Sequence, residues 1–287
     1  MISMIPLDMP RRLLLILTMA ALLLALLPTL GCDRDPESAP SERPAPLTIA
    51  AAADLRFAMD DLIADFLASR PDDAPVVDLR VTYGSSGNFF AQITQRAPFD
   101  IYFSADVAYP TLLVEKGLAI EESLFEYAIG RIVIWVPETS PLDVETLQWE
   151  TLTSGEARRI AIANPEHAPY GTAAVAAIQT AELYDQVLPK LVYGENIAQA
   201  AQFIESGAAD AGIIALAIAM APAMSNKGRY WEIPIDSFPT MVQGGLVTKW
   251  TRQPELAMEF RAYVLGPRGR EILTRYGFFL PHETSAP

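Results

Sequence analysis

The sequence has one cysteine, Cys32, and only two histidines, His167 and His282. A single cysteine excludes an internal disulfide and a cysteine-based zinc site, and two histidines leave little material for a histidine metal site or a serine–histidine catalytic centre. Positive charge is also scarce, because 21 Lys and Arg face 35 Asp and Glu, a net charge of −14. Such a chain has no basic stripe to neutralise a phosphate backbone, so its composition argues against a nucleic-acid partner as well as against catalysis.

What is present is a chain able to fold. It has 287 residues, of which 51% are hydrophobic and 20% charged. This composition lies away from the low-hydrophobicity, high-charge range in which chains stay disordered. The length is enough for one large domain or for two lobes with their own cores.

The N-terminus has the layout of a signal peptide over residues 1–31. Arg11 and Arg12 precede an apolar run over 13–27, which is followed by Gly31 and the only cysteine. This ending resembles a bacterial lipoprotein cleavage box, although Thr29 stands where that box usually has Leu. We therefore expect Cys32 to be lipidated, and a retained membrane helix is the alternative, since the run is near the lower length limit for a span.

Residues 32–46 are expected to form a disordered tether. The string DRDPESAPSERPAP, over 33–46, is rich in Pro, Ser and charge and has no periodic apolar positions. Such a tether would hold a folded body off the membrane surface.

From Leu47 onward short apolar runs alternate with amphipathic stretches, which is the rhythm of an α/β fold with a parallel sheet covered by helices. The expected strands are 47–53, 76–83, 100–105, 131–136, 159–163, 190–193, 211–216 and 244–250. The expected helices are one with apolar positions from Phe57 to Leu67, then 88–95, 109–116, two that begin near Gly171 and Asn196, and finally 254–265 and 268–276.

Four strand-to-helix turns are the places to expect a ligand. In parallel sheets ligands bind outside the carboxyl ends of the strands, where helix N-termini direct unpaired N–H groups into the crevice. The turns lie at 51–56, 83–88, 164–172 and 194–198. Asp54 and Asn196 are also candidate helix N-caps. His167 is more simply explained as a structural or surface histidine, because the sequence shows no partner for it.

Taken together, these turns resemble one family over about residues 47–279. The strings TIAAAADLRFAMDDL, YGSSGNFFAQI, APFDIYFSADVAY, IANPEHAPYGTAA, YGENIAQAAQFI, DAGIIAL and GPRGREILTRYGF look like the periplasmic molybdate-binding proteins of ABC transporters. The resemblance implies a type II solute-binding fold, in which two α/β lobes with mostly parallel sheets are joined by two hinge strands. Lobe 1 would comprise 47–128 plus 236–287, and lobe 2 would comprise 129–235.

The resemblance also implies a function. The protein would capture molybdate or tungstate for the membrane permease of an ABC importer. It would be an exported, monomeric and non-enzymatic protein without a cofactor, held at the outer face of the membrane by lipid on Cys32. Molybdenum would enter only as the bound oxyanion, with no direct protein–metal ligand.

Five positions carry over as oxyanion-binding residues by motif. Ser86 matches a family serine, and Tyr170 and Ile197 fall where backbone N–H groups donate. Two depart from the pattern: Asp54 stands where the family commonly has serine, and Ala215 where a tyrosine often donates its phenol. A carboxylate donates only when protonated, and alanine has no donor.

These departures leave alternatives open. Asp54 either caps its helix with its side chain turned away or is protonated and donates, and the Tyr170 phenol is a candidate replacement for the donor missing at Ala215. The alternative functions are binding of another oxyanion or a small organic acid, an exported serine hydrolase using Ser85 or Ser86, and a sensor or adhesion lipoprotein that has lost transport. Against the serine hydrolase, the sequence around Ser85 and Ser86 has no nucleophile-elbow pattern, and neither histidine lies in a recognisable triad motif.

Overall fold

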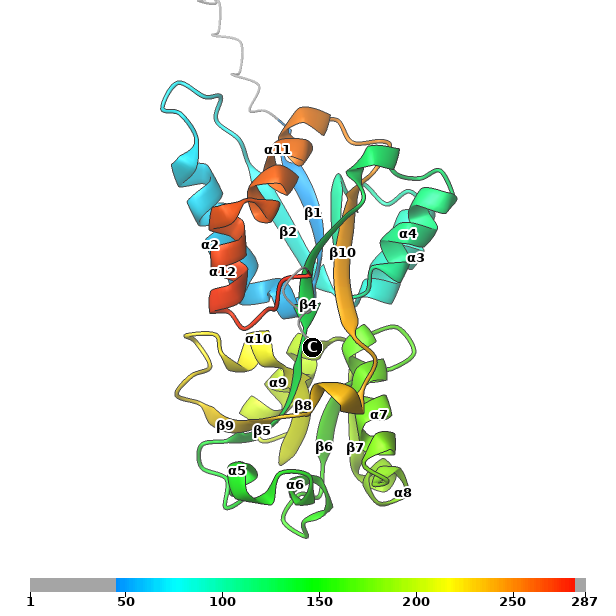
Figure 1. Ribbon diagram of the computed structural model, residues 1–287, viewed down its shortest axis with the longest axis vertical. Helices are drawn as coiled ribbons and strands as arrows, with labels where there is room; N and C mark the ends of the chain where they lie inside the picture. Colours follow the sequence, from blue (N-terminus) through cyan, green and yellow to red (C-terminus); the bar gives the residue numbers. More distant parts are fainter. Residues whose placement is uncertain (1–44, 282–287) are drawn as a thin grey trace, which may run out of the picture. The chain divides into compact units, whose positions relative to one another are not determined.

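The computed structural model describes residues 45–281, which contain two five-stranded sheets flanked by helices (Figure 1). The signal peptide, Cys32 and nearly all of the tether lie outside these residues. We call the first sheet with its helices lobe 1 and the second sheet with its helices lobe 2. Within the described residues, no helix is both long enough and apolar enough to cross a membrane.

Lobe 1 is built on a sheet with the strand order β2-β1-β3-β10-β4. Its strands are β1 (Leu47–Ala52), β2 (Leu79–Gly84), β3 (Ile101–Ser104), β4 (Phe125–Gly130) and β10 (Met241–Val247). Its helices are α2 (Arg56–Ser69), α3 (Ser86–Thr94), α4 (Ala108–Glu115), α11 (Pro254–Leu265) and α12 (Pro267–Arg275), with the short 3-10 turns η2 (Ala53–Leu55) and η3 (Glu121–Ser123).

Lobe 2 is built on a sheet with the order β7-β6-β8-β5-β9. Its strands are β5 (Ile132–Pro137), β6 (Ile160–Ala163), β7 (Leu191–Gly194), β8 (Ala211–Ala215) and β9 (Gly228–Glu232). Its helices are α5 (Val144–Leu147), α6 (Glu150–Thr153), α7 (Pro169–Thr180), α8 (Tyr184–Val187), α9 (Ile197–Glu205) and α10 (Leu216–Ala219), with the 3-10 turns η4 (Leu188–Lys190) and η5 (Ile235–Ser237).

The sheets are mixed, but in each of them four of the five strands run in the same direction, so the expected mostly parallel arrangement is confirmed. β1 pairs in parallel with β2 and β3, and β6 with β7 and β8. β10 and β5, in contrast, run antiparallel to both of their neighbours. β10 and β5 each begin at the end of the sheet where the parallel strands finish. They do so because the chain comes to each of these strands from the opposite lobe.

Two stretches of chain join the lobes. β4 ends at Gly130 and β5 begins at Ile132, so only Arg131 separates a strand of one sheet from a strand of the other. The return runs from β9 through η5 to β10, and Figure 1 shows both connections between the two sheets. The two-lobed α/β fold is therefore confirmed, while the boundaries at 128/129 and 235/236 stay a prediction.

The expected strands and helices are present with shifts of a few residues, and two strands were missed. β4 and β9 both lie at sheet edges and contain charged residues. Every residue of β9 is at least partly exposed, so it lacks the apolar run that marks the central strands.

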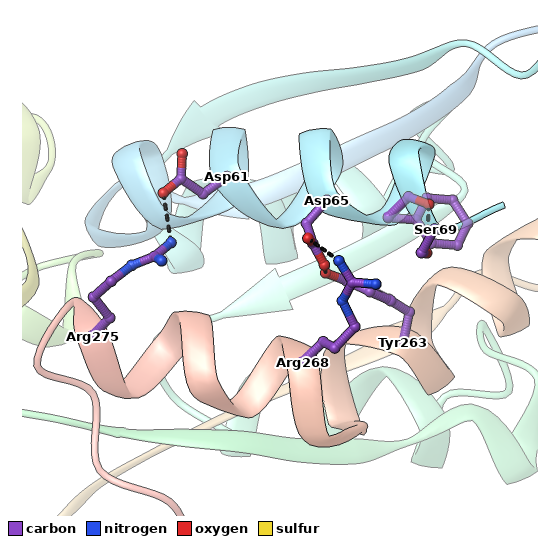
Figure 2. A network of polar contacts seen from close by, with 7 residues as sticks. Asp61, Asp65, Ser69, Tyr263, Arg268 and Arg275 are labelled. Carbon is purple, nitrogen blue, oxygen red and sulfur yellow. Dashed lines mark hydrogen bonds and ion pairs between the residues drawn. The ribbon is translucent and has the colours of Figure 1, made fainter.

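Helices α2 and α12 are joined by polar contacts on the surface of lobe 1. Figure 2 shows Asp61 and Asp65 of α2 facing Arg275 and Arg268 of α12. The Tyr263 phenol of α11 also donates to Asp65. We call this set the α2–α12 network.

Candidate functional site

A small pocket lies where the helix starts of the two lobes meet. Its lining residues come from turns at the carboxyl ends of strands, as expected for a ligand site in an α/β sheet. They are Ala52, Ala53, Asp54, Gly84, Ser85, Ser86, Ala105, Ala168, Pro169, Tyr170, Asn196 and Ile197. Four of the five positions carried over from sequence, Asp54, Ser86, Tyr170 and Ile197, are thus brought together.

Ala215 is not among the residues that line this pocket. It is the last residue of β8, fully buried and paired with Ile132 at the start of β5. Its methyl group therefore packs in the interior of lobe 2.

Ser86 is the first residue of α3 and is 1% exposed. The Ser86 Oγ accepts a hydrogen bond from the Ala105 backbone N–H at 2.9 Å, and the Tyr102 phenol donates to the Ser86 carbonyl oxygen at 2.7 Å. The Ser86 hydroxyl also has a side-chain hydrogen bond with the Tyr102 phenol, and this bond lowers the pKa of Tyr102 against the larger effect of burial. The hydroxyl is thus fixed in place at the edge of the pocket.

Lobe 2 supplies backbone N–H groups. Tyr170 is the second residue of α7 and Ile197 the first of α9, positions whose amides have no partner inside the helix. No backbone acceptor for either amide is found in the described part of the chain. Asn196 caps α9 as expected, because its Oδ1 accepts from Ala198 and Gln199 at 3.1 Å each. The cap fixes the first turn of α9 and leaves the Ile197 amide free.

Asp54 does not cap a helix, which corrects one of the two alternatives for its side chain. It lies inside the turn η2, and the N-caps of η2 and α2 are Ala52 and Leu55. Its Oδ2 accepts from the Tyr170 phenol at 2.9 Å and from the Gln243 amide at 2.7 Å. The Tyr170 phenol is therefore already engaged by Asp54 and does not replace the donor missing at Ala215.

The environment of Asp54 favours its neutral form. The side chain is 1% exposed and its Oδ1 has no hydrogen-bond partner among the residues described. Burial raises the pKa of Asp54 from 3.8 to about 6, against the opposite effect of the hydrogen bonds from Gln243 and Tyr170. Burial also raises the pKa of Tyr170 well above 10, and the nearby Asp54 carboxylate adds to this rise. The phenol therefore stays protonated and acts as a donor.

Gln243 is a site residue that the sequence analysis missed. It is fully buried in β10, donates to Asp54 and also donates to the Tyr170 hydroxyl oxygen at 2.9 Å. The expected strand began one residue later, at Gly244, so the local pattern did not mark Gln243 as a buried strand residue. Gly130 makes room for this cluster, because a Cβ there would lie 2.7 Å from the Tyr170 hydroxyl and 2.8 Å from Gln243 Nε2.

His167 joins the lobes beside the pocket. Its Nδ1 lies 3.0 Å from Ser85 Oγ, and its carbonyl accepts from the Gly87 N–H at 2.9 Å. The partner that the sequence did not show for this histidine is therefore Ser85. Gly87 is required for this close approach, since a Cβ there would lie 2.7 Å from the His167 carbonyl oxygen.

The pocket contains neither a cationic side chain nor a metal-binding cluster. Its lining includes no Lys or Arg. Among the described residues, no group of three His, Cys, Asp or Glu side chains is placed to hold a metal ion. The ligand chemistry available is therefore that of neutral donors and one carboxyl group.

Comparison with known proteins shows to which family the chain belongs. A model of the bacterial extracellular solute-binding proteins matches residues 47–279. The chain belongs to this family. It is therefore an exported protein of a class that binds solutes, and the family resemblance seen in the sequence is confirmed.

Individual relatives agree with this assignment. The chain is 34% identical to the molybdate-binding protein ModA of Rhodobacter capsulatus over 200 residues, 69% of this chain and 77% of that protein. The solved structure of the periplasmic molybdate-binding protein of Azotobacter vinelandii superposes with a TM-score of 0.75 at 31% identity, covering 82% of this chain and 99% of that one. A putative ABC transporter substrate-binding lipoprotein of Bacillus subtilis, YvgL, is 28% identical over 90% of this chain and 95% of its own length.

Proposed function

We propose that the protein captures molybdate or tungstate and delivers it to the membrane permease of an ABC importer. The pocket between the lobes carries this proposal. It gathers the Ser86 hydroxyl and the Tyr170 and Ile197 amides around a space whose described lining residues include no cationic side chain. Two relatives are named for molybdate binding, which supports the choice of ligand.

A doubly charged anion is held in such a site by fixed dipoles. The N–H groups at the starts of α3, α7 and α9 are unpaired within their helices, and each helix N-terminus carries partial positive charge. In a pocket removed from water these dipoles interact with the ion far more strongly than distant surface charges do, since surface charges are screened beyond about 8 Å at physiological salt. The net charge of −14 therefore does not prevent anion binding.

The proposed ligand site includes donors from both lobes, so the lobes are expected to close on the ligand. We propose lobe 1 as 47–128 plus 236–287 and lobe 2 as 129–235. The protein acts as a monomer and needs no cofactor.

Anchoring by lipid on Cys32 is part of the proposal. A lipoprotein of the same transport class among the relatives supports it. Replacement Cys32→Ala is expected to release the protein from membranes during a detergent-free wash. Retention of the processed variant on the membrane would favour a retained helix instead.

Calorimetry with molybdate, tungstate, sulfate, phosphate and a small carboxylate tests the ligand. We expect saturable binding of molybdate and tungstate. Ser86→Ala removes a donor to a charged ligand and should weaken binding about 10- to 100-fold. Ser225→Ala is the control, because Ser225 is exposed and its hydroxyl donates to the Pro222 carbonyl, away from the pocket lining. Tight binding of a carboxylate with no response to molybdate would overturn the proposed ligand.

One observation favours the alternative of an exported hydrolase, since His167 Nδ1 lies 3.0 Å from Ser85 Oγ. A serine nucleophile needs a base that a third group orients. Within residues 45–281 no carboxylate is bonded to the His167 ring. We therefore expect no turnover of nitrophenyl esters beyond the background rate, and turnover abolished by Ser85→Ala would establish the hydrolase.

A further inference from the structure

The carboxyl group of Asp54 has one oxygen committed and one free. Oδ2 takes the hydrogen bonds from Tyr170 and Gln243, whereas Oδ1 is buried and has no partner in the described part of the chain. Asp54 lines the pocket proposed to hold the oxyanion. Oδ1 is therefore the atom of Asp54 that remains for a ligand.

An ionised carboxylate and a bare oxyanion cannot bond to each other, because both only accept hydrogen bonds. Burial without a paired charge makes their repulsion costly. One proton between the two oxygens removes the repulsion and supplies a charge-assisted hydrogen bond.

Among the residues that the structure describes, none near Asp54 is a cation that would remove the need for this proton. The titratable groups near it are the phenols of Tyr170 from α7 and Tyr127 from β4. α10, which packs against η2, contains only apolar residues. Arg56 at the start of α2 is exposed, and its guanidinium lies over the Phe57 ring.

We propose that the site binds its oxyanion together with one proton, shared between Asp54 Oδ1 and a ligand oxygen. This inference rests on the proposed function, because it concerns the same pocket. With a bare dianion such as molybdate, the ionised carboxyl group takes one proton from a buffer acid in solution as the ion enters: the acid's bond to hydrogen breaks, its conjugate base stays in solution, an O–H bond forms at Oδ1, and no bond in the ligand breaks. Hydrogen phosphate already carries the proton and needs none from solvent.

The consequence is a binding constant that depends on pH in a ligand-specific way. The pKa of Asp54 in the ligand-free protein is about 6, so the carboxyl group is mostly ionised above this pH. Above this pH the protein takes up about one proton for each molybdate that it binds, so the affinity for molybdate falls about tenfold per pH unit. Below about pH 6 the affinity levels off. Hydrogen phosphate shows no such loss in the range where it is the main phosphate species.

Calorimetry on the full-length chain in a neutral detergent tests this, from about pH 6.5 to pH 8.5. Molybdate, sulfate and inorganic phosphate are the probes, and two buffers of different ionisation enthalpy give the number of protons taken up. For molybdate we expect about one proton per ion and a loss of about tenfold per pH unit. Asp54→Asn should bind molybdate without proton uptake and with a flat pH profile, because its amide donates at every pH. Asp65→Asn, which changes a partly exposed carboxylate of the α2–α12 network, should keep the wild-type slope.

The outcomes separate this inference from the proposed function. Molybdate binding by the wild type with no proton uptake and a flat profile overturns the shared proton and leaves the proposed function standing. No heat from any anion, with the wild type and Asp54→Asn alike, overturns the proposed function. Tighter binding of phosphate than of molybdate, without proton uptake, supports the shared proton and moves the ligand to a protonated oxyanion.

Discussion

Asp54 and Asp65 lie eleven positions apart, and each accepts a hydrogen bond from a tyrosine phenol. The pKa values of the two carboxyl groups are nevertheless shifted in opposite directions. Burial raises the pKa of Asp54 to about 6, whereas the Arg268 guanidinium, helped by the Tyr263 phenol, lowers the pKa of Asp65. The same type of donor is thus present at both sites and does not decide the outcome.

What differs is the second partner and the access of water. Asp54 has a neutral amide, Gln243, as its second donor and is 1% exposed. Asp65 has a guanidinium on the surface of lobe 1 (Figure 2). Two neutral donors do not offset the free energy that a carboxylate loses on desolvation, whereas a charge-assisted pair at the surface loses little. The ionised form of Asp54 therefore lowers the stability of the folded protein, and it places a proton-accepting group beside the pocket.

Replacement of Asp54 should have the largest effect on stability. A folded-state pKa of about 6 against 3.8 means that the folded protein binds more protons, so stability is full below pH 3.8 and is lost as the pH rises through about 6. The shift corresponds to about 3 kcal/mol at pH 7. Asp54→Asn keeps an acceptor for Tyr170 and Gln243 without the charge, and should recover about this amount in urea unfolding at pH 7 and little at pH 4.

Asp65→Asn is the matched control. Its lowered pKa contributes stability above pH 3.8 that is lost as the pH falls, so the replacement should destabilise at pH 7 and never stabilise. Equal effects of the two replacements would show that burial does not distinguish the two carboxyl groups.

Replacement of Tyr170 or Tyr263 by phenylalanine tests how much each phenol donor contributes to stability. Tyr170→Phe removes a bond that favours the ionised form of Asp54, so the pKa of Asp54 should rise further and the protein should lose about 2 kcal/mol at pH 7. Tyr263→Phe should cost less, because Arg268 still pairs with Asp65. Urea unfolding of both variants measures the difference, and a greater loss for Tyr263→Phe would contradict the comparison.

Gly130→Ala tests the close packing of the buried cluster. The added Cβ would approach the Tyr170 hydroxyl and the Gln243 amide to less than 3 Å. We expect a loss of about 1–2 kcal/mol in unfolding and a weaker affinity for molybdate. Gly155→Ala is the control, since a Cβ at Gly155 meets nothing within 4 Å. Equal unfolding midpoints for the two variants would show that the cluster tolerates displacement.

Much of the fold was predictable because its central strands are apolar runs and its helices have amphipathic spacing. β6, for example, is entirely buried and is flanked by turn residues. The edge strand β9 and the direction of β5 and β10 were not predictable, since they depend on how the chain passes between the sheets. Local sequence patterns contain no information on that path.

The site was predictable where backbone geometry defines it. The turns that contain Ser86, Tyr170 and Ile197 follow strands and begin helices, so their sequence positions indicate their place. The partners of Asp54 were not predictable, because Tyr170 and Gln243 are 116 and 189 positions away from it. Its role as a cap was a local interpretation, and contacts across the fold determine its environment instead.

A carbon-13 titration of the aspartate carboxyl groups, with Asp54 and Asp65 assigned by their Asn variants, measures the pKa of each group. We expect a pKa of about 6 for Asp54, a pKa below 3.8 for Asp65, and a further rise at Asp54 alone when molybdate is added. A pKa for Asp54 at or below 3.8, or one that molybdate leaves unchanged while it binds, would show that burial does not hold a proton-accepting group beside the pocket.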